Sequence, residues 1–310
     1  MIFNQIINNR NMQFSLTRNM RKYKNSSWST VPPDAFTGCD RLIEVSFPNA
    51  TVIGGDAFWG CSSLIKATIP NVEIIDDWAF QDCVNLTYID CSSVISIGSG
   101  AFSCCYNISS ANFSLCVSVG GSAFNSCSAL MEVSFPETTY MGANAFRSCY
   151  SLSKVHMPKA AFVGNQAFMH DSLITTLSFP LASQLGNNAF NGCTALSEIY
   201  IPACTEMFNG VFLDCYMLSE ISFGAYASYI PSSAFRNCYR LISLNLTQVS
   251  SVPPMSYTAT TNVFYSTPIG GYSAVAGQYG SVYVPASLYS DFISASYWSA
   301  ISARIVSVSA

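Results

Sequence analysis

A repeat of 22 residues is the feature that most constrains how this 310-residue chain can fold. A phenylalanine, usually preceded by alanine, returns at this interval eight times in succession, and the ninth interval is longer by a single position. Chance does not produce such a series, and a fixed period of this size indicates a repeat protein. The phenylalanines are Phe36, Phe58, Phe80, Phe102, Phe124, Phe146, Phe168, Phe190, Phe212 and Phe235.

Other positions keep the same period and give the unit a local structure. A cysteine lies three residues after nine of these phenylalanines, and Asp171 takes its place after Phe168. The segment L-x-x-V-x-F-P alternates apolar and polar residues, which predicts a short, half-buried strand that the proline ends. A glycine often follows an aliphatic residue, as at Gly54, Gly98 and Gly186. We expect this glycine to allow a turn with positive φ.

One unit of this length cannot bury its own apolar face, so the units must stack to form a continuous core. The pattern therefore predicts an α/β-type repeat solenoid dominated by short parallel β-strands, with about ten 22-residue repeats over residues 31–252. Residues 1–30 form an atypical basic N-terminal segment or cap. Residues 253–310 are predicted to be a long loop around Phe264 followed by a C-terminal strand–helix cap. Val282–Val284 is the expected last strand, and the expected buried stripe of a closing helix is Leu288, Phe292, Trp298, Ile301 and Ile305.

The repeat closely resembles the BspA-type leucine-rich repeats of bacterial surface proteins over residues 31–252. The resemblance implies a right-handed leucine-rich repeat superhelix. Family members are mostly cell-surface adhesins and binding proteins, and similar chains occur in phage-associated genes. They share no catalytic site, so the resemblance carries no catalytic residue to this chain. It implies a cell-surface location, although the first residues lack the apolar run of a signal peptide.

Charge and hydropathy exclude two classes of partner. The chain has 13 basic and 17 acidic residues, and five of the basic ones lie within the first 24 positions. The remainder therefore holds 8 basic against 17 acidic residues, whereas a nucleic-acid-binding body carries a basic stripe. No apolar run approaches the roughly 18 residues of a membrane helix. We expect no nucleic-acid partner and no membrane span.

The cysteines and histidines predict little chemistry. Thirteen cysteines, nine of them in one column, do not suit a disulfide framework and predict buried, reduced thiols in a reducing or anaerobic setting. His156 and His170 are the only histidines, so a histidine triad or multi-histidine metal site is not expected. We expect no cofactor and no metal. Asp171 is predicted to bond backbone amides of its turn in place of the thiol.

The concave surface of a solenoid is its usual binding face, and strand alternation shows which side chains point outward there. The outward rows are small and polar, with tyrosines as islands. The expected cross-strand pairs Glu44–Lys66 and Glu132–Lys154 need no ligand to explain them, whereas Glu198 beside Glu220 is a like-charge pair that hints at a use. The predicted contact residues are Tyr88, Asp90, Lys154, His156, Glu198 and Tyr200.

Two functions follow as hypotheses. The first is a non-enzymatic binding or adhesion module that recognises protein or glycan through the concave face. The alternative is a structural or virion-associated component of a larger assembly, docked by its basic N-terminal arm. A separate row of tyrosines follows the cysteine column and is interpreted as packing or as a second sticky edge. Its members are Tyr106, Tyr150, Tyr216 and Tyr239.

Overall fold

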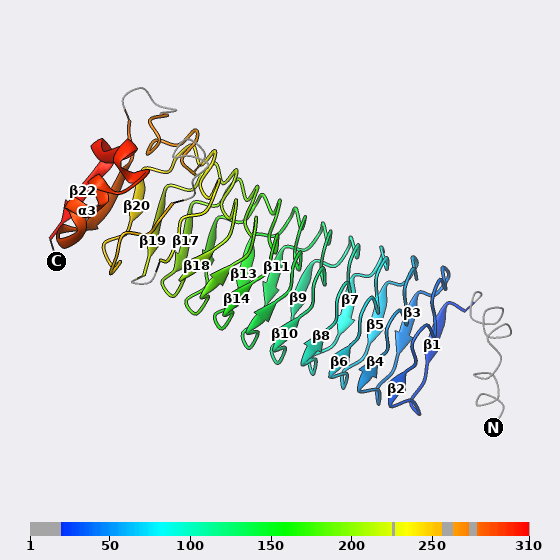
Figure 1. Ribbon diagram of the computed structural model, residues 1–310. Helices are drawn as coiled ribbons and strands as arrows, with labels where there is room; N and C mark the ends of the chain where they lie inside the picture. Colours follow the sequence, from blue (N-terminus) through cyan, green and yellow to red (C-terminus); the bar gives the residue numbers. More distant parts are fainter. Residues whose placement is uncertain (1–19, 225–226, 256–262, 273–277, 310) are drawn as a thin grey trace.

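The protein is an elongated solenoid in which the strands follow one another in chain order from one end to the other (Figure 1). The computed structural model describes residues 20–224, 227–255, 263–272 and 278–309. The ten registered repeats, with one coil before them and one after, make about twelve turns. The predicted parallel-strand solenoid is confirmed, and the helices among the described residues are confined to its C-terminal end. Residues 1–19, which hold most of the predicted N-terminal arm, lie outside the described residues.

The first row of strands is formed by the V-x-F segments. The strands pair in parallel with their counterparts in the next repeat, as in the register Val45↔Ala67 and Ala67↔Ile89, and they form three successive hydrogen-bonded sheets. Side chains on this row alternate between the core and the outside, as the pattern predicts. The strands are β1 (Lys22–Lys24), β3 (Glu44–Ser46), β5 (Lys66–Thr68), β7 (Tyr88–Asp90), β9 (Ser110–Asn112), β11 (Glu132–Ser134), β13 (Lys154–His156), β15 (Thr176–Ser178), β17 (Glu198–Ile201), β19 (Glu220–Phe223), β20 (Ser243–Asn245), β21 (Ser281–Pro285) and β22 (Ile305–Val308).

A second row of two-residue strands forms one continuous parallel sheet of nine strands on another side of the coil. The second residue of each strand is buried, because it is the aliphatic residue that precedes the glycine position. The strands are β2 (Thr30–Val31), β4 (Val52–Ile53), β6 (Ile74–Ile75), β8 (Ser96–Ile97), β10 (Ser118–Val119), β12 (Tyr140–Met141), β14 (Phe162–Val163), β16 (Gln184–Leu185) and β18 (Glu206–Met207).

The Ala-Phe turn forms the third corner of each coil. Its backbone is also bonded from coil to coil, as where the Phe58 N–H donates to the Ala79 carbonyl at 2.8 Å. The phenylalanine rings stack in one buried column from Phe36 to Phe264, and neighbouring ring centroids lie 5.0–5.8 Å apart. Apolar burial and ring stacking therefore run without a break through the repeats.

The cysteine column is buried and reduced, as predicted, and it is also hydrogen-bonded. All 13 cysteines are free thiols, and burial raises the pKa of the column thiols. Eight column thiols donate to the phenylalanine carbonyl of the preceding coil, with Sγ–O distances of 3.0–3.2 Å, a contact that the sequence did not predict. The donors are Cys61, Cys83, Cys105, Cys127, Cys149, Cys193, Cys215 and Cys238.

Asp171 interrupts this column. Its side chain is fully buried, and its Oδ1 accepts the Cys149 N–H at 2.7 Å. The predicted bond to a backbone amide is present, but the amide belongs to the turn of the preceding coil and not to the turn of Asp171 itself. Its Oδ2 has no hydrogen-bond partner among the described residues. Burial raises the pKa of this carboxyl well above its ordinary value. The seventh repeat thus holds a polar group that the other repeats lack at this position.

The predicted role of the glycines is wrong. Gly54, Gly98 and Gly186 are not in the left-handed region, and a Cβ on them would lie 2.5–2.6 Å from backbone of the preceding coil. Glycine is needed there for close approach of two backbones. The left-handed residues instead flank the phenylalanine, such as Ser122 and Ser126 with φ of 56° and 62°. They reverse the chain direction within a tight turn.

The solenoid extends beyond the predicted ten repeats at both ends. At the start, β1 pairs with β3, and the rings of Tyr23 and Trp28 pack against Phe36. At the other end, the segment predicted to be a loop contains a further coil, because Phe264 stacks on Phe235 at 5.8 Å. Residues 256–262 and 273–277 of that segment lie outside the described residues.

The C-terminal cap differs from the predicted single helix. The expected strand at 282–284 is confirmed within β21, but Ile305 belongs to a further strand, β22, that pairs with β21. Three short helices lie between them, η2 (Ala286–Leu288), α3 (Tyr289–Ser294) and η3 (Trp298–Arg304). Extended Ala295 and left-handed Tyr297 separate α3 from η3. Of the predicted stripe, Leu288 is only partly buried, and the other four residues are buried.

This arrangement has a physical reason. The last coil leaves two things uncovered, the end of the apolar core and the edge of the first sheet. Phe292 and Trp298 cover the core, meeting edge to face at 5.1 Å, while β22 pairs with the sheet edge. Among the described residues no helix has the length and apolar character that crossing a membrane requires.

Candidate functional site

The predicted contact residues lie on the outward surface of the first-row strands, which we call the strand face. They occupy three strands in pairs, on β7, β13 and β17. Because parallel neighbours lie about 4.8 Å apart, the pair on β13 is about 14 Å from β7 and about 10 Å from β17. The six residues are therefore spread along the strand face and do not form a single compact site.

The first pair combines an exposed ring with a half-buried acid. Tyr88 is 52% exposed, and the Lys66 ammonium lies 5.5 Å from its ring centroid in a cation–π contact. Asp90 is half-buried on the same strand. This end of the strand face therefore offers an aromatic surface and a carboxylate side by side.

The second pair consists of a lysine and a histidine, and the lysine forms an ion pair that the sequence predicts. Lys154 Nζ lies 3.4 Å from Glu132 Oε2, and His156 is exposed beside it on β13. The other predicted pair, Glu44–Lys66, has a longer contact of 3.9 Å, and Lys22 of β1 also approaches Glu44, at 2.8 Å. These are exposed pairs, which contribute little to stability.

The third pair carries the most exposed tyrosine of the strand face. Tyr200 is 60% exposed, with Ser178 and Ser222 level with it on the adjacent strands. The same register places Glu198 level with Glu220, as predicted. Neither carboxylate is in an ion pair within the described part of the chain. Both stay available to a partner that carries donors or positive charge.

The first row of strands has two interruptions, between β7 and β9 and between β13 and β15, where the strands described here are not joined in one hydrogen-bonded sheet. Ile89 and Val155 are the inward residues at these places. They are only partly buried, whereas the other residues of their column are buried. The strand face thus opens toward the core beside two of the three predicted pairs.

A second candidate surface lies on the turns that follow the phenylalanines, away from the strand face. It is a hollow of about 480 Å³, which we call the turn-edge hollow. Four of its lining residues belong to the column that follows the cysteines, where Tyr150 and Tyr216 enclose Ser172 and Thr194. Because three coils separate the two tyrosines, they are about 14 Å apart. Small residues between large ones therefore create the hollow.

The remaining lining residues come from the left-handed position before the cysteine. They are His170, Gly192 and Asp214, with φ of 71°, 76° and 60°. A Cβ on Gly192 would lie 2.7 Å from His170 Nδ1, so the imidazole lies above this glycine. Asp214 Oδ1 accepts a hydrogen bond of 2.7 Å from Asn237 Nδ2. The hollow therefore has an imidazole and a carboxylate at its rim.

The tyrosine row, which the sequence left open between packing and a sticky edge, packs at its C-terminal end, and binding by its exposed members stays a prediction. Tyr216 stacks on Tyr239 at 5.1 Å, and Tyr239 meets Tyr272 at 5.9 Å. Tyr106 and Tyr150 are 44% and 54% exposed. The stack holds the Tyr216 ring in place from its C-terminal side.

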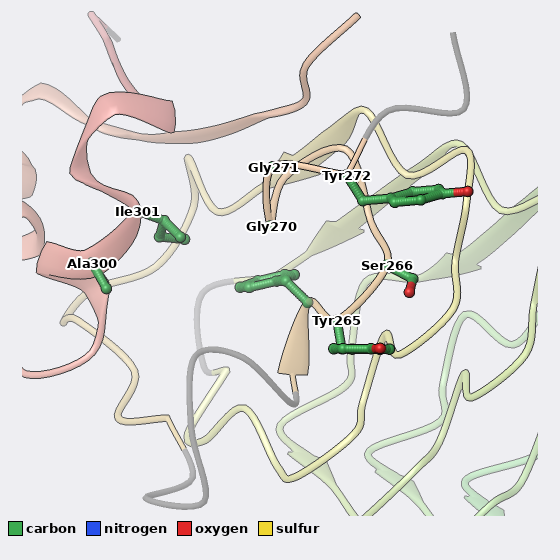
Figure 2. Close-up of a pocket in the computed structure, with 8 residues that line it drawn as sticks. Tyr265, Ser266, Gly270, Gly271, Tyr272, Ala300 and Ile301 are labelled. Carbon is green, nitrogen blue, oxygen red and sulfur yellow. The ribbon is translucent and has the colours of Figure 1, made fainter. Parts of the chain in front are cut away.

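Tyr272 also lines a second hollow, of about 590 Å³, between the last described coil and the cap. Figure 2 shows Tyr265, Ser266 and Tyr272 on one side of it and Ala300 and Ile301 of the η3 helix on the other.

Sequence reasoning found the strand face but not the turn-edge hollow. A signal was present, because the tyrosine row is replaced by Ser172 and Thr194 in the two repeats between Tyr150 and Tyr216. Recognising it required knowing that this column faces outward. In the described part of the chain, no three side chains of His, Cys, Asp or Glu come together in a way that could hold a metal ion.

Comparison with known proteins identifies the repeat. The chain matches the family described as BspA type Leucine rich repeat region (6 copies), over residues 5–115, 51–175 and 139–263. A search of curated proteins finds no match.

Two similar solved structures are bacterial. A leucine-rich repeat protein from Bacteroides ovatus is 17% identical, covers 90% of this chain and 87% of its own, and has a TM-score of 0.39. A leucine rich cell surface protein from Faecalibacterium prausnitzii is 21% identical, with coverages of 87% and 83% and a TM-score of 0.45.

Proposed function

Since the chain belongs to the BspA-type leucine-rich repeat family, we propose that it is a non-enzymatic binding module. Its strand face recognises a protein or glycan partner. One observation carries this proposal: the inward columns of the first-row strands stay apolar in every repeat, while the outward rows of the same strands vary in size, charge and aromatic character. The solenoid supplies a constant scaffold, and the varied rows supply specificity.

The two interruptions of the sheet support the same face. Recognition surfaces combine an apolar centre with a polar rim. Ile89 lies beside Tyr88 and Asp90, and Val155 lies between Lys154 and His156. Each opening thus joins a partly exposed aliphatic side chain to polar groups that can orient a partner.

The chemistry of the side chains supports a non-enzymatic role. A cysteine nucleophile must be a thiolate, and burial raises the pKa of the column thiols. His156 is on the strand face and His170 is on the turn edge, so the histidines do not act together.

A binding screen tests the proposal. The full chain is screened against arrays of glycans and extracellular proteins, beside a variant with Tyr88, Asp90, Lys154, His156 and Tyr200 changed to alanine. The control is Tyr140→Ala, which removes a 49%-exposed ring from the second row. A partner lost only in the five-residue variant supports recognition by the strand face.

Two outcomes oppose the proposal. A partner retained by the five-residue variant moves recognition to another surface. No partner for a folded sample favours the alternative of a structural component docked by its N-terminal arm. That alternative is tested by deleting residues 1–19 and measuring assembly, since a longer deletion would also remove Tyr23 and Trp28 from the first coil.

A further inference from the structure

The turn-edge hollow presents an aromatic face. Tyr239 stacks on the C-terminal side of Tyr216, and the hollow lies on the opposite side, over the two preceding coils. Stacking of this kind keeps the plane of the Tyr216 ring across the solenoid axis, so that the free face of the ring points toward the hollow. It is pre-oriented, so a ligand that packs on it loses little side-chain entropy.

Polar groups surround this aromatic face. Ser172 and Thr194 carry hydroxyls on the floor, and His170 and Asp214 lie at the rim. Hydroxyls donate and accept, although the Thr194 hydroxyl already donates to the Ser172 carbonyl at 3.4 Å, and a carboxylate only accepts. Burial, followed by the nearby Asp214 charge, raises the pKa of Tyr216, so its hydroxyl also keeps its proton. The ligand must therefore offer several donors as well as acceptors.

Charge narrows the ligand class further. None of the residues lining the hollow is lysine or arginine, so a phosphate, sulfate or uronate would meet no lysine or arginine there. Asp214 repels such groups. A proline-rich peptide also suits tyrosine-lined grooves, but prolines have no N–H to donate to a carboxylate.

A sugar ring meets these conditions together, because it has an apolar C–H face and a rim of hydroxyls that donate and accept. We infer that the turn-edge hollow is a binding site for a short neutral saccharide. One sugar packs on Tyr216, and its hydroxyls bond Ser172, Thr194, His170 and Asp214. The span of about 14 Å to Tyr150 leaves room for further sugar units. This site is separate from the strand face and does not depend on the function proposed for it.

Titration of the full chain tests the inference. The probes are neutral gluco-, manno- and galacto-oligosaccharides of two to four units, up to about 5 mM, with an oligogalacturonate and a proline-rich peptide as competing classes. Thr194→Tyr fills the hollow with the residue that the same column carries in four other repeats. Tyr216→Ala removes the aromatic face. Tyr106→Ala is the matched control, since it removes a 44%-exposed tyrosine of this column outside the hollow.

We expect at least one neutral oligosaccharide to bind. Thr194→Tyr and Tyr216→Ala should each weaken it about tenfold or more, and Tyr106→Ala should stay within about twofold. Circular dichroism and thermal unfolding establish that each variant is folded. If the Tyr216→Ala variant is destabilised, the binding measured with the Thr194→Tyr variant alone tests the inference.

Three results overturn the inference. They are the absence of binding by any neutral probe, binding that Thr194→Tyr leaves unchanged, and tighter binding of the uronate or peptide in the hollow. The five-residue strand-face variant separates the two proposals. If the five-residue variant no longer binds the saccharide but the Thr194→Tyr variant still does, the result supports binding at the strand face and refutes binding in the turn-edge hollow.

Discussion

The buried columns and the strand face share the same repeat period but differ in what the period preserves. In the ten repeats, the buried phenylalanine column keeps one residue type, and the cysteine column does so except at Asp171, with contacts that recur from coil to coil. The inward columns of the first-row strands keep their apolar character. The strand face repeats only its polarity. Tyrosine, lysine, serine, threonine and glutamate occupy equivalent outward positions.

This difference shows which positions restrict the choice of residue. A side chain in a buried column contacts the same residue in both neighbouring coils, so one change disturbs two interfaces. An outward side chain contacts its neighbours weakly and is free to vary. Four predictions test this contrast, from the largest expected effect to the smallest.

Removing one ring from the phenylalanine column should have the largest effect. Phe124 is buried between Phe102 at 5.1 Å and Phe146 at 5.3 Å. Phe124→Ala should lower the free energy of unfolding by about 3–5 kcal/mol. Denaturant unfolding followed by circular dichroism measures it. The control Tyr88→Ala, on the strand face, should change it by less than about 1 kcal/mol. Equal effects of the two variants would contradict the contrast.

Adding one methyl group where two coils approach should come next. A Cβ on Gly142 would overlap the backbone nitrogen of Gly121, so Gly142→Ala should cost about 1–3 kcal/mol of stability. Gly121→Ala is the matched control, because its Cβ would meet its nearest atom at 3.3 Å. Thermal unfolding of both variants measures the difference. A Gly121 variant as unstable as the Gly142 variant would count against close approach as the cause.

Restoring the regular column should stabilise the protein. Asp171→Cys removes a buried oxygen without a partner in the described part of the chain and restores a thiol, so we expect a gain of about 1–3 kcal/mol at neutral pH. Because burial raises the pKa of Asp171, the wild type loses stability as pH rises from about 4 toward that raised pKa. The gain from the variant should therefore grow with pH over this interval.

Urea unfolding of wild type and Asp171→Cys under reducing conditions, in steps from pH 4 to 8, measures this difference. Ionisable groups common to both proteins cancel in the comparison. A gain that does not change with pH would show that Asp171 does not titrate on folding.

The strand-face ion pair should have the smallest effect. Lys154 is 75% exposed and Glu132 55% exposed, so a double-mutant cycle with Lys154→Ala and Glu132→Ala should give a coupling below about 1 kcal/mol. Raising the salt concentration should reduce it further. A coupling of several kcal/mol would place this pair among the structural contacts.

Much of this architecture could be predicted because the repeat samples the same environment ten times. The period identified the inward columns, the parallel strands and the buried thiols. It also indicated Asp171 as the exception and the amide bond that this residue makes. The predicted ligand residues followed from alternation alone, and whether they bind a partner stays a prediction.

The predictions that proved wrong concern the C-terminal tail, where the repeat ends, and the glycines, whose role depends on the distance between two coils. Gly98 was predicted to adopt a turn with positive φ. Glycine is required there because the backbone of Asp77 in the preceding coil leaves no space for a Cβ, and no local sequence pattern shows this. The C-terminal tail was predicted as one helix because its apolar spacing fits one. The structure divides it, since the same residues must cover both a core end and a strand edge.

The sequence by itself determined that this protein is a stack of similar coils, because a single repeat unit has no other way to bury its apolar face. The tertiary structure alone decided which outward residues become neighbours. Tyr150, Thr194 and Tyr216 are far apart in the chain and enclose one hollow only because coils about 4.8 Å apart place them on the same edge. Stacking turns a separation of one whole repeat along the chain into contact between adjacent side chains.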